Sequence, residues 1–315
     1  MVKEFADGIL NFDKPSGITS MDVVRTVKRL THVRRVGHAG TLDPIATGVL
    51  PVCMGQATRL MEYMIDGRKA YRAELTLGAV TDTYDADGQI VATGDASEIT
   101  RAQVEALLPV FTGTLQQQPP MYSALKHEGK RLYDLARAGI EVERPDREVI
   151  VYDLTLTDWA PPKVTVVAEC GRGFYMRTLA HDMGQALGCG AHLSALTRLR
   201  AGTMSIEGGV SLERFEHTIA EGEWRDLLLP PDAAVADMEA LALEPSGERQ
   251  LRNGQPITVR PGGGATYAEH AERRRAYSSS GRFLAVVRFN RAQNQWQPER
   301  VFDLASPSLL APGAA

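Results

Sequence analysis

The chain alternates between hydrophobic and polar residues over positions 71–77. Tyr71, Ala73, Leu75 and Leu77 are each separated from the next by one polar residue. A period of two predicts a strand that buries one face, and Tyr71 belongs to that face. Shorter apolar runs predict further strands over 9–12, 49–54, 148–159, 164–170 and 283–289.

Apolar residues at helical spacing predict three helices between these strands. The first begins at Ser20, an N-cap residue type, and carries an apolar stripe over 23–30. Thr100 and Gln103 form a capping box that opens the second. The third spans 174–187, where leucine or methionine recurs every four residues. We expect an α+β fold, with a mixed, largely antiparallel sheet and flanking helices.

The pattern changes beyond about Asp232, where short strands follow one another with few helix signals. The length of 315 residues exceeds the usual size of one domain and fits one large domain or two unequal ones, and this change of pattern favours two. We expect a large domain over 1–235, a small β-rich domain over 236–305 and a frayed tail over 306–315.

The composition argues against several classes of protein. A hydrophobic content of 43% is enough for a core, and a net charge of −4 argues against a strongly basic nucleic-acid-binding protein. The three cysteines, Cys53, Cys170 and Cys189, are too few and too scattered for a disulfide framework or a zinc site. No apolar run is long enough for a membrane span, and no signal peptide is evident. We therefore expect a cytoplasmic protein without a metal site.

Residues 116–147 form a long polar and basic insertion. Tyr122 and Tyr133 lie there among lysine and arginine residues, a combination typical of segments that contact nucleic acid. This composition fits a mobile basic arm over a substrate and a solvated surface excursion about equally well.

The stretch 37–48 holds three glycines and one proline around a single carboxylate, Asp43. Because proline disfavours the α-region for the preceding residue, Asp43 is predicted to be extended or in a turn. Such a frame fits a placed reactive group, although taken alone it also fits a solvated aspartate in a tight turn. Arg34 and Arg35 add positive charge just before it.

Six segments together resemble one family. They are DKPSGITS (13–20), GHAGTLDPIATG (37–48), KAY (69–71), TDTYD (81–85), PPMYSALK (119–126) and CGRGFYMRTL (170–179). In content and order they are similar to segments of the TruB family of bacterial tRNA pseudouridine synthases. That family isomerises the uridine at nucleotide 55, in the T-loop of tRNA.

The resemblance implies roles for three side chains. Asp43 matches the essential catalytic aspartate, and Arg177 matches the arginine that pairs with it. Tyr71 matches the tyrosine that stacks on the target base and is a candidate for proton removal at C5. Taken alone, Arg177 fits a surface arginine near a helix end, and Tyr71 fits a core aromatic.

The resemblance also implies a set of substrate-binding residues. Tyr175 and Leu196 match positions near the target uridine, and His38 matches the histidine that fills the T-loop stack when the base leaves. Arg59, Lys126 and Asp85 complete the expected substrate-binding set. Arg59 stands where lysine is commoner in the family. Segments 251–256 and 300–302 resemble a PUA-like RNA-binding domain.

The implied reaction needs no cofactor or metal. A carboxylate can capture the substrate covalently or stabilise an oxocarbenium-like centre, and attack at C6 or at C1′ stays open. The target base must leave its stack at a cost of about a few kcal/mol, which phosphate contacts can offset. The expected partner is the T-arm of tRNA, bound by a monomer. The alternatives are a tRNA-binding or tRNA-folding module and a catalytic subunit guided by separate RNAs.

Overall fold

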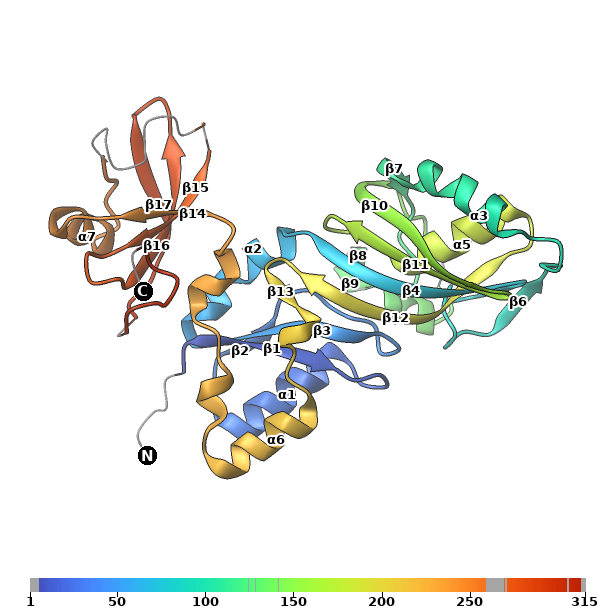
Figure 1. Cartoon of the computed structure of the whole chain (residues 1–315), viewed down its shortest axis with the longest axis horizontal. Coiled ribbons are helices and arrows are strands. Elements are labelled where there is room, and N and C mark those ends of the chain that lie inside the picture. Colours follow the sequence, from blue (N-terminus) through green and yellow to red (C-terminus); the bar gives the residue numbers. More distant parts are fainter. Residues whose placement is uncertain are drawn as a thin grey trace.

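The structure is a computed structural model that describes residues 6–123, 125–127, 129–140, 142–258, 269, 271–304 and 306–312. Within these residues the chain forms one large mixed sheet with flanking helices and a separate four-stranded sheet near the C-terminus (Figure 1). The expected α+β fold class is thus confirmed.

The large sheet has the strand order β1-β3-β12-β4-β11-β10-β7. Its strands are β1 (Gly8–Lys14), β3 (Thr47–Met54), β12 (Ala191–Ala201), β4 (Lys69–Leu77), β11 (Lys163–Cys170), β10 (Arg147–Ala160) and β7 (Gly113–Gln117). Two short strands extend it, β2 (Val36–His38) beside β3 and β13 (Met204–Ser205) beside β12. Neighbours along this order are antiparallel except β12 and β3, which run parallel where Thr197 faces Thr47. The sheet is therefore mixed and largely antiparallel, as predicted.

Strand β4 has the alternation that the sequence predicts. Ala73, Leu75 and Leu77 are buried, whereas Arg72 is exposed. Because β4 lies between β11 and β12 in the middle of the sheet, its apolar face packs into the core beneath a helix. Tyr71 therefore lies near the centre of the sheet.

Four helices cover the large sheet. They are α1 (Ser20–Thr31), α3 (Arg101–Leu107), α5 (Met176–Leu187) and α6 (Leu212–Glu221). Helix α5 packs on β12 and β4, α3 lies beside α5 and β10, and α1 and α6 lie together at the β1 and β2 end (Figure 1). The predicted N-cap at Ser20 is wrong by one residue, because Thr19 and Asp22 form the capping box and the Ser20 hydroxyl is used elsewhere.

Short elements fill the remaining connections. They are α2 (Met61–Asp66), α4 (Leu132–Arg137), β5 (Ala79–Thr81), β6 (Ile90–Thr93), β8 (Lys126–His127), β9 (Lys130–Arg131) and the 3-10 helices η1 (Gly55–Leu60), η2 (Leu108–Phe111), η3 (Ile206–Gly208), η4 (Trp224–Leu227) and η5 (Pro231–Val235). The insertion over 116–147 therefore holds a small hairpin and a short helix. Its base is closed by two hydrogen bonds, from Gln118 Nε2 to the Arg144 carbonyl (3.1 Å) and from Arg144 Nη1 to the Pro119 carbonyl (3.0 Å).

The small sheet near the C-terminus has the order β14-β15-β16-β17. Its elements are β14 (Glu239–Ala242), β15 (Arg273–Tyr277), β16 (Phe283–Asn290), β17 (Gln295–Val301) and the helix α7 (Pro245–Arg252). The sequence predicts β16 but not β15, because the charged run at its start hides the strand pattern. The turn expected over 251–256 begins within the end of α7.

The two sheets share one hydrophobic cluster. Leu60 and Met64, from η1 and α2, are buried in the same cluster as Phe283 and Phe302 of the small domain. Polar contacts flank it, and the Gln56 side chain donates a hydrogen bond to the Asp303 carbonyl (2.7 Å). A common core of this kind fixes the small domain against the large one.

Residues 306–312 are packed, although fraying was expected over 306–315; residues 313–315 lie outside the described part of the chain. Ser308 and Ala311 are buried among residues 306–312. The Ser308 hydroxyl and the Tyr277 hydroxyl both donate to Oδ2 of the fully buried Asp232, each at 2.6 Å. A buried carboxylate needs such donors, so these hydrogen bonds hold the tail against η5 and, through Asp232, against β15 of the small domain. In the described part of the chain, no helix is both long and apolar enough to cross a membrane.

Candidate active site

Asp43 lies in the loop between β2 and β3, in the turn that the following proline predicts. The Ala46 amide donates to the Asp43 carbonyl (3.1 Å) and closes this turn. The Asp43 side chain is 34% exposed. Its carboxylate is therefore open to a substrate, while its backbone is held.

Helix α1 and strand β1 hold the same loop from one side. The Leu42 amide donates to the Ser20 hydroxyl (2.8 Å), and that hydroxyl donates back to the Leu42 carbonyl (3.1 Å). The buried Lys14 ammonium donates to the Pro44 carbonyl (3.3 Å), and the Gly17 amide donates to the same oxygen (2.9 Å). The residues on both sides of Asp43 thus have fixed positions.

Arg198 of β12 holds the loop from the other side, and the sequence analysis missed it. Its side chain is buried, with Nη2 donating to the Gly40 carbonyl (3.1 Å) and Nε donating to the Val49 carbonyl (2.6 Å). At Gly48, which has a φ of 96°, a Cβ atom would collide with the Arg198 carbonyl. The strand alternation contains the missed signal, because Arg198 shares a face with the buried Leu196 two residues earlier.

Arg177 pairs with Asp43 across 134 residues of sequence. Its side chain is only 5% exposed and lies in the first turn of α5. Nη2 donates to Asp43 Oδ1 (3.1 Å), and Nε lies 3.0 Å from Oδ2 in a contact that is not aligned as a hydrogen bond. The guanidinium therefore approaches both carboxylate oxygens and orients them.

Asp85 lies on the other side of the same guanidinium. Arg177 Nη1 is 3.5 Å from Asp85 Oδ2, and the Thr83 hydroxyl donates to Oδ1 (2.5 Å). Burial raises the pKa of the Asp85 carboxyl, and the Thr83 hydrogen bond and the Arg177 cation oppose that rise. Nη2 of Arg177 also donates to the Tyr122 carbonyl (2.8 Å). Arg177 thus lies between two carboxylates, those of Asp43 and Asp85, and the expected role of Asp85 in substrate binding stays a prediction.

Tyr71 occupies the sheet beside this cluster. On β4 it faces Ala168 of β11 and Arg198 of β12. Burial raises the pKa of the Tyr71 phenol; the Arg198 cation opposes this, and the Asp43 carboxylate adds to it. Because Arg198, the cross-strand neighbour of Tyr71, donates to the Gly40 carbonyl of the Asp43 loop, Tyr71 lies beside that loop, and the three residues with implied catalytic roles gather in one region.

Tyr175 lies immediately before α5 and is braced by a buried glutamine. The Tyr175 amide donates to Gln117 Oε1 (2.8 Å), and Gln117 Nε2 donates to the Tyr175 carbonyl (3.1 Å). Burial raises the pKa of the Tyr175 phenol, to which Asp43 also contributes. Leu196 is buried in the core next to Thr47, which donates to its carbonyl (3.3 Å).

The other expected substrate-binding residues have different surroundings. His38 is half-buried at the end of β2, and burial lowers the pKa of its imidazole. Lys126 lies in β8, but its side chain is outside what the structure describes. Arg59 lies at the domain interface, where Nη1 donates to the Val301 carbonyl (2.5 Å) and the guanidinium is 5.1 Å from the Phe302 ring centre. Arg59 thus contacts the small domain, a role that the sequence did not indicate.

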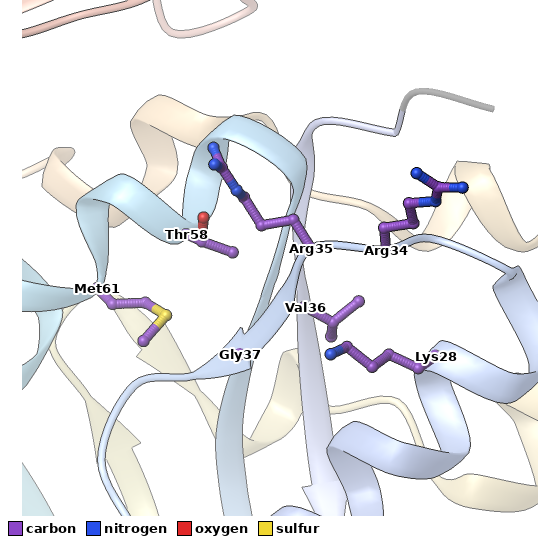
Figure 2. Close-up of a pocket in the computed structure, with 7 residues that line it drawn as sticks. All are labelled: Lys28, Arg34, Arg35, Val36, Gly37, Thr58 and Met61. Carbon is purple, nitrogen blue, oxygen red and sulfur yellow. The ribbon is translucent and has the colours of Figure 1, made fainter. Parts of the chain in front are cut away.

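A basic pocket of about 430 Å³ opens where α1 ends and β2 begins. Lys28, Arg34 and Arg35 line it together with Val36, Gly37, Thr58 and Met61 (Figure 2). No acidic residue lines it, and none of the three cations has an ion pair among the described residues. Arg35 extends toward Thr58, and Lys28 points toward Val36. Strand β2 leads from this pocket directly to His38 and the Asp43 loop.

Comparison with known proteins places this site in a family. The model described as TruB family pseudouridylate synthase (N terminal domain) matches residues 28–176, and that described as tRNA pseudouridylate synthase B C-terminal domain matches 177–236. The chain belongs to the TruB family. The resemblance inferred from the six segments is thereby confirmed.

Relatives match over most of the chain. The tRNA pseudouridine synthase B of Dehalococcoides mccartyi is 42% identical over 296 residues, which cover 94% of this chain and 96% of that protein. The protein of the same name from Symbiobacterium thermophilum is 48% identical over 257 residues, 81% of this chain and 84% of that protein. A crystal structure described as a Cbf5-Nop10-Gar1 complex has a TM-score of 0.72 at 24% identity and covers 96% of this chain and 86% of that one. This last similarity supports the fold alone.

Proposed function

We propose that this protein isomerises uridine to pseudouridine in the T-loop of tRNA, at nucleotide 55. The observation that carries the proposal is the arrangement of Asp43, oriented by Arg177, in a loop held on both sides. Relatives that are 40–48% identical over most of the chain are named tRNA pseudouridine synthase B. An oriented carboxylate beside an aromatic ring suits a reaction that detaches and rejoins a base.

The proposed reaction conserves all atoms. The Asp43 carboxylate attacks C1′ or C6, the N1–C1′ bond breaks, and the uracil turns in the site. C5 then bonds to C1′, the carboxylate is released, C5 loses its proton and N1 gains one. Because each bond that breaks is replaced within the same nucleoside, the chemistry calls for no oxidant or reductant.

We propose that the uracil stacks on the ring of Tyr71. The raised pKa of its phenol means that the ring is protonated near neutral pH. A role as the acceptor of the C5 proton therefore requires that bound RNA lowers this pKa, whereas a stacking role does not. Tyr175 and Leu196 are proposed to border the base, and His38 to fill the stack that the base leaves.

RNA binding is proposed to extend from the active site across the basic pocket. The unpaired cations Lys28, Arg34 and Arg35 suit phosphate groups, because guanidinium and ammonium groups with no acidic neighbour lose no ion pair on binding. The arm over 116–147, including Lys126, is proposed to cover the RNA. Phosphate contacts of this kind offset the cost of extruding the base. We infer a monomer, since one chain supplies every group invoked, and we propose that it acts on tRNA in the cytoplasm.

The test is the variant Asp43→Asn on a T-loop RNA. Mass-resolved nucleoside analysis is expected to find no pseudouridine, while a filter-binding assay gives a Kd near that of the unaltered protein. Asp158→Asn, which changes an exposed acid on β10, is the matched control and retains activity. Persistent turnover by Asp43→Asn would remove Asp43 from the reaction.

A second candidate function is the refolding of tRNA. One observation favours it: the basic pocket contains none of Asp43, Tyr71 and Arg177, so the phosphate contacts proposed there do not involve them. A fluorescence assay of tRNA refolding with Asp43→Asn separates the two functions. Refolding at the unaltered rate supports this role, and no refolding at any protein concentration excludes it.

A further inference from the structure

Tyr84 has a backbone conformation that tyrosine rarely adopts. Its φ is 64°, in the left-handed region. For a bulky residue this conformation is an outlier, and such strain persists only where the surroundings hold it. Tyr84 lies in the turn between β5 and β6, directly between Thr83 and Asp85. The strain is therefore stored next to a carboxylate that faces Arg177.

Three contacts hold Tyr84 in this conformation. Its amide donates to the Thr81 carbonyl (3.2 Å), and its carbonyl accepts from the Leu193 amide (3.0 Å). Its ring stacks on His181 of α5, with ring centres 4.0 Å apart and planes 16° from parallel. The Thr81 bond closes the turn itself and the Leu193 bond ties the turn to β12, so the ring stack is the contact that ties Tyr84 to the helix.

Helix α5 contacts three consecutive residues of this turn. His181 follows Arg177 by four residues, so both side chains project from the same face of the helix. Arg177 Nη1 reaches the Thr83 carbonyl and Asp85 Oδ2, each at 3.5 Å. The distances between Arg177 and Asp85 thus depend on how the turn lies against the helix, to which the stack contributes beside the hydrogen bonds of Tyr84 and Ala86 with Leu193.

We propose that His181 and Tyr84 are positioning residues: their stack sets the 83–85 turn against α5, which places Asp85 on Arg177 and directs Arg177 toward Asp43. The proposal rests on the proposed function for its catalytic readout. Neither ring needs to touch the RNA. The sequence gives no sign of this pair, because 97 positions separate residues that meet only through the turn.

The chemistry of the His181 ring favours stacking as its role. Burial lowers the pKa of the imidazole, so the ring is neutral near neutral pH. Nδ1 is enclosed and has no hydrogen-bond partner among the described residues. A flat apolar ring of similar size is therefore expected to substitute for the imidazole, which a hydrogen-bonding or proton-transfer role would not allow.

The experiment compares His181→Ala, His181→Phe, Tyr84→Gly and Tyr84→Phe under single-turnover conditions with saturating enzyme. His181→Ala and Tyr84→Gly are expected to lower the rate about ten-fold or more, since a misplacement of ~1 Å can cost about 10²-fold. The phenylalanine variants keep the stack and are expected to stay within about three-fold of the unaltered rate, with the Kd for RNA unchanged within about two-fold in all four. His217→Ala, which removes an exposed histidine of α6, is the matched control.

Two further measurements make the result decisive. If both residues act through one stack, the double variant His181→Ala/Tyr84→Gly is no slower than the slower single variant. Hydrogen exchange of the amides over 82–88 is expected to be faster in His181→Ala, a readout that needs no RNA and that stands even if the proposed function fails. Unchanged hydrogen exchange in His181→Ala would overturn the proposal, and so would a double variant whose rate loss is the product of the two single losses. A raised Kd for RNA with an unaltered single-turnover rate would also overturn it, and would make Tyr84 an RNA contact.

Discussion

The cations of the α1–β2 pocket and those of the small C-terminal domain have opposite surroundings. Lys28, Arg34 and Arg35 line a pocket without any acidic residue. In the small domain, Arg252 pairs with Glu248 and Asp303, each at 3.0 Å, and Arg273 pairs with Glu299 at 2.7 Å. Arg274 and Arg282 likewise contact glutamates. These four arginines of the small domain are paired with carboxylates, whereas the three cations of the pocket have no ion pair among the described residues.

This difference explains how a chain with a net charge of −4 can present a basic surface. An arginine that is already paired gains little from a phosphate, because it must give up its carboxylate first. A free cation has no such loss and only releases counterions. Pairing, not the number of arginines, therefore separates the cations that hold the fold from those available to RNA.

The largest expected effect concerns the most buried paired cation. Arg177→Lys keeps the charge but loses the planar fork that reaches both Asp43 and Asp85, so we expect the single-turnover rate to fall about 10²-fold or more. Arg252→Lys makes the same change in the small domain and is expected to leave the rate unaltered. Single-turnover pseudouridine formation measures both. Equal rates for the two variants would contradict the role of Arg177.

The free cations are tested by their salt dependence. The triple variant Lys28→Ala/Arg34→Ala/Arg35→Ala is expected to raise the Kd for tRNA about ten-fold or more at ~0.1 M salt. The slope of log Kd against log salt should decrease by about 0.7–0.9 for each phosphate group that the variant no longer neutralises. The rate at saturating enzyme stays unaltered, because the active site is intact.

A control that removes the same charge sharpens this test. Arg252→Ala/Arg273→Ala/Arg282→Ala deletes three paired cations of the small domain. It is expected to lower thermal stability modestly and to leave the salt slope unaltered. If both triple variants change the slope equally, the distinction between paired and free cations does not govern RNA binding.

Arg59 could belong to either group of cations, those that hold the fold or those available to RNA. Its side chain is exposed, yet it donates to the Val301 carbonyl and lies over the Phe302 ring. Arg59→Ala is expected to lower the free energy of unfolding by about 1–2 kcal/mol in urea denaturation, with the salt slope for RNA unaltered. A reduced slope at unaltered stability would instead assign Arg59 to RNA, as the family resemblance implies.

The sequence predicted the elements that depend on local pattern. The alternation of β4, the turn at Asp43 and the third helix are present in the structure. The strand β15 was not predicted because a run of arginines is typical of an exposed segment. The sequence does not show that these arginines pair with glutamates in the folded protein. Local pattern thus identifies an element only where its own residues show which face is buried.

The candidate site depended on more than local pattern. The pairing of Arg177 with Asp43 came only from the family resemblance, since the two residues are far apart in sequence. Arg198 and Lys14 were missed as braces of the loop, because a buried cation that donates to carbonyls has no compositional signature. The contact of Asp85 with Arg177 depends on a turn with a left-handed tyrosine, which no propensity predicts.

The last expected effect depends on pH and concerns a carboxylate inside the fold. Asp182 on α5 has no ion pair in the described part of the chain, and burial, with a further contribution from Asp146, raises its pKa to about 6. Above about pH 6 the charged Asp182 carboxylate therefore lowers the free energy of unfolding. This cost disappears as the pH falls toward about 4, where Asp182 is protonated in the folded state and takes up a proton in the unfolded chain as well. Asp182→Asn removes the charge, so we expect it to raise the free energy of unfolding by about 1–2 kcal/mol near pH 7.5, allowing for partial exposure, and by nothing near pH 4. Urea denaturation across this range, with Asp158→Asn as the exposed control, measures the difference; a gain that is constant with pH would show that the free carboxylate of Asp182 carries no such cost.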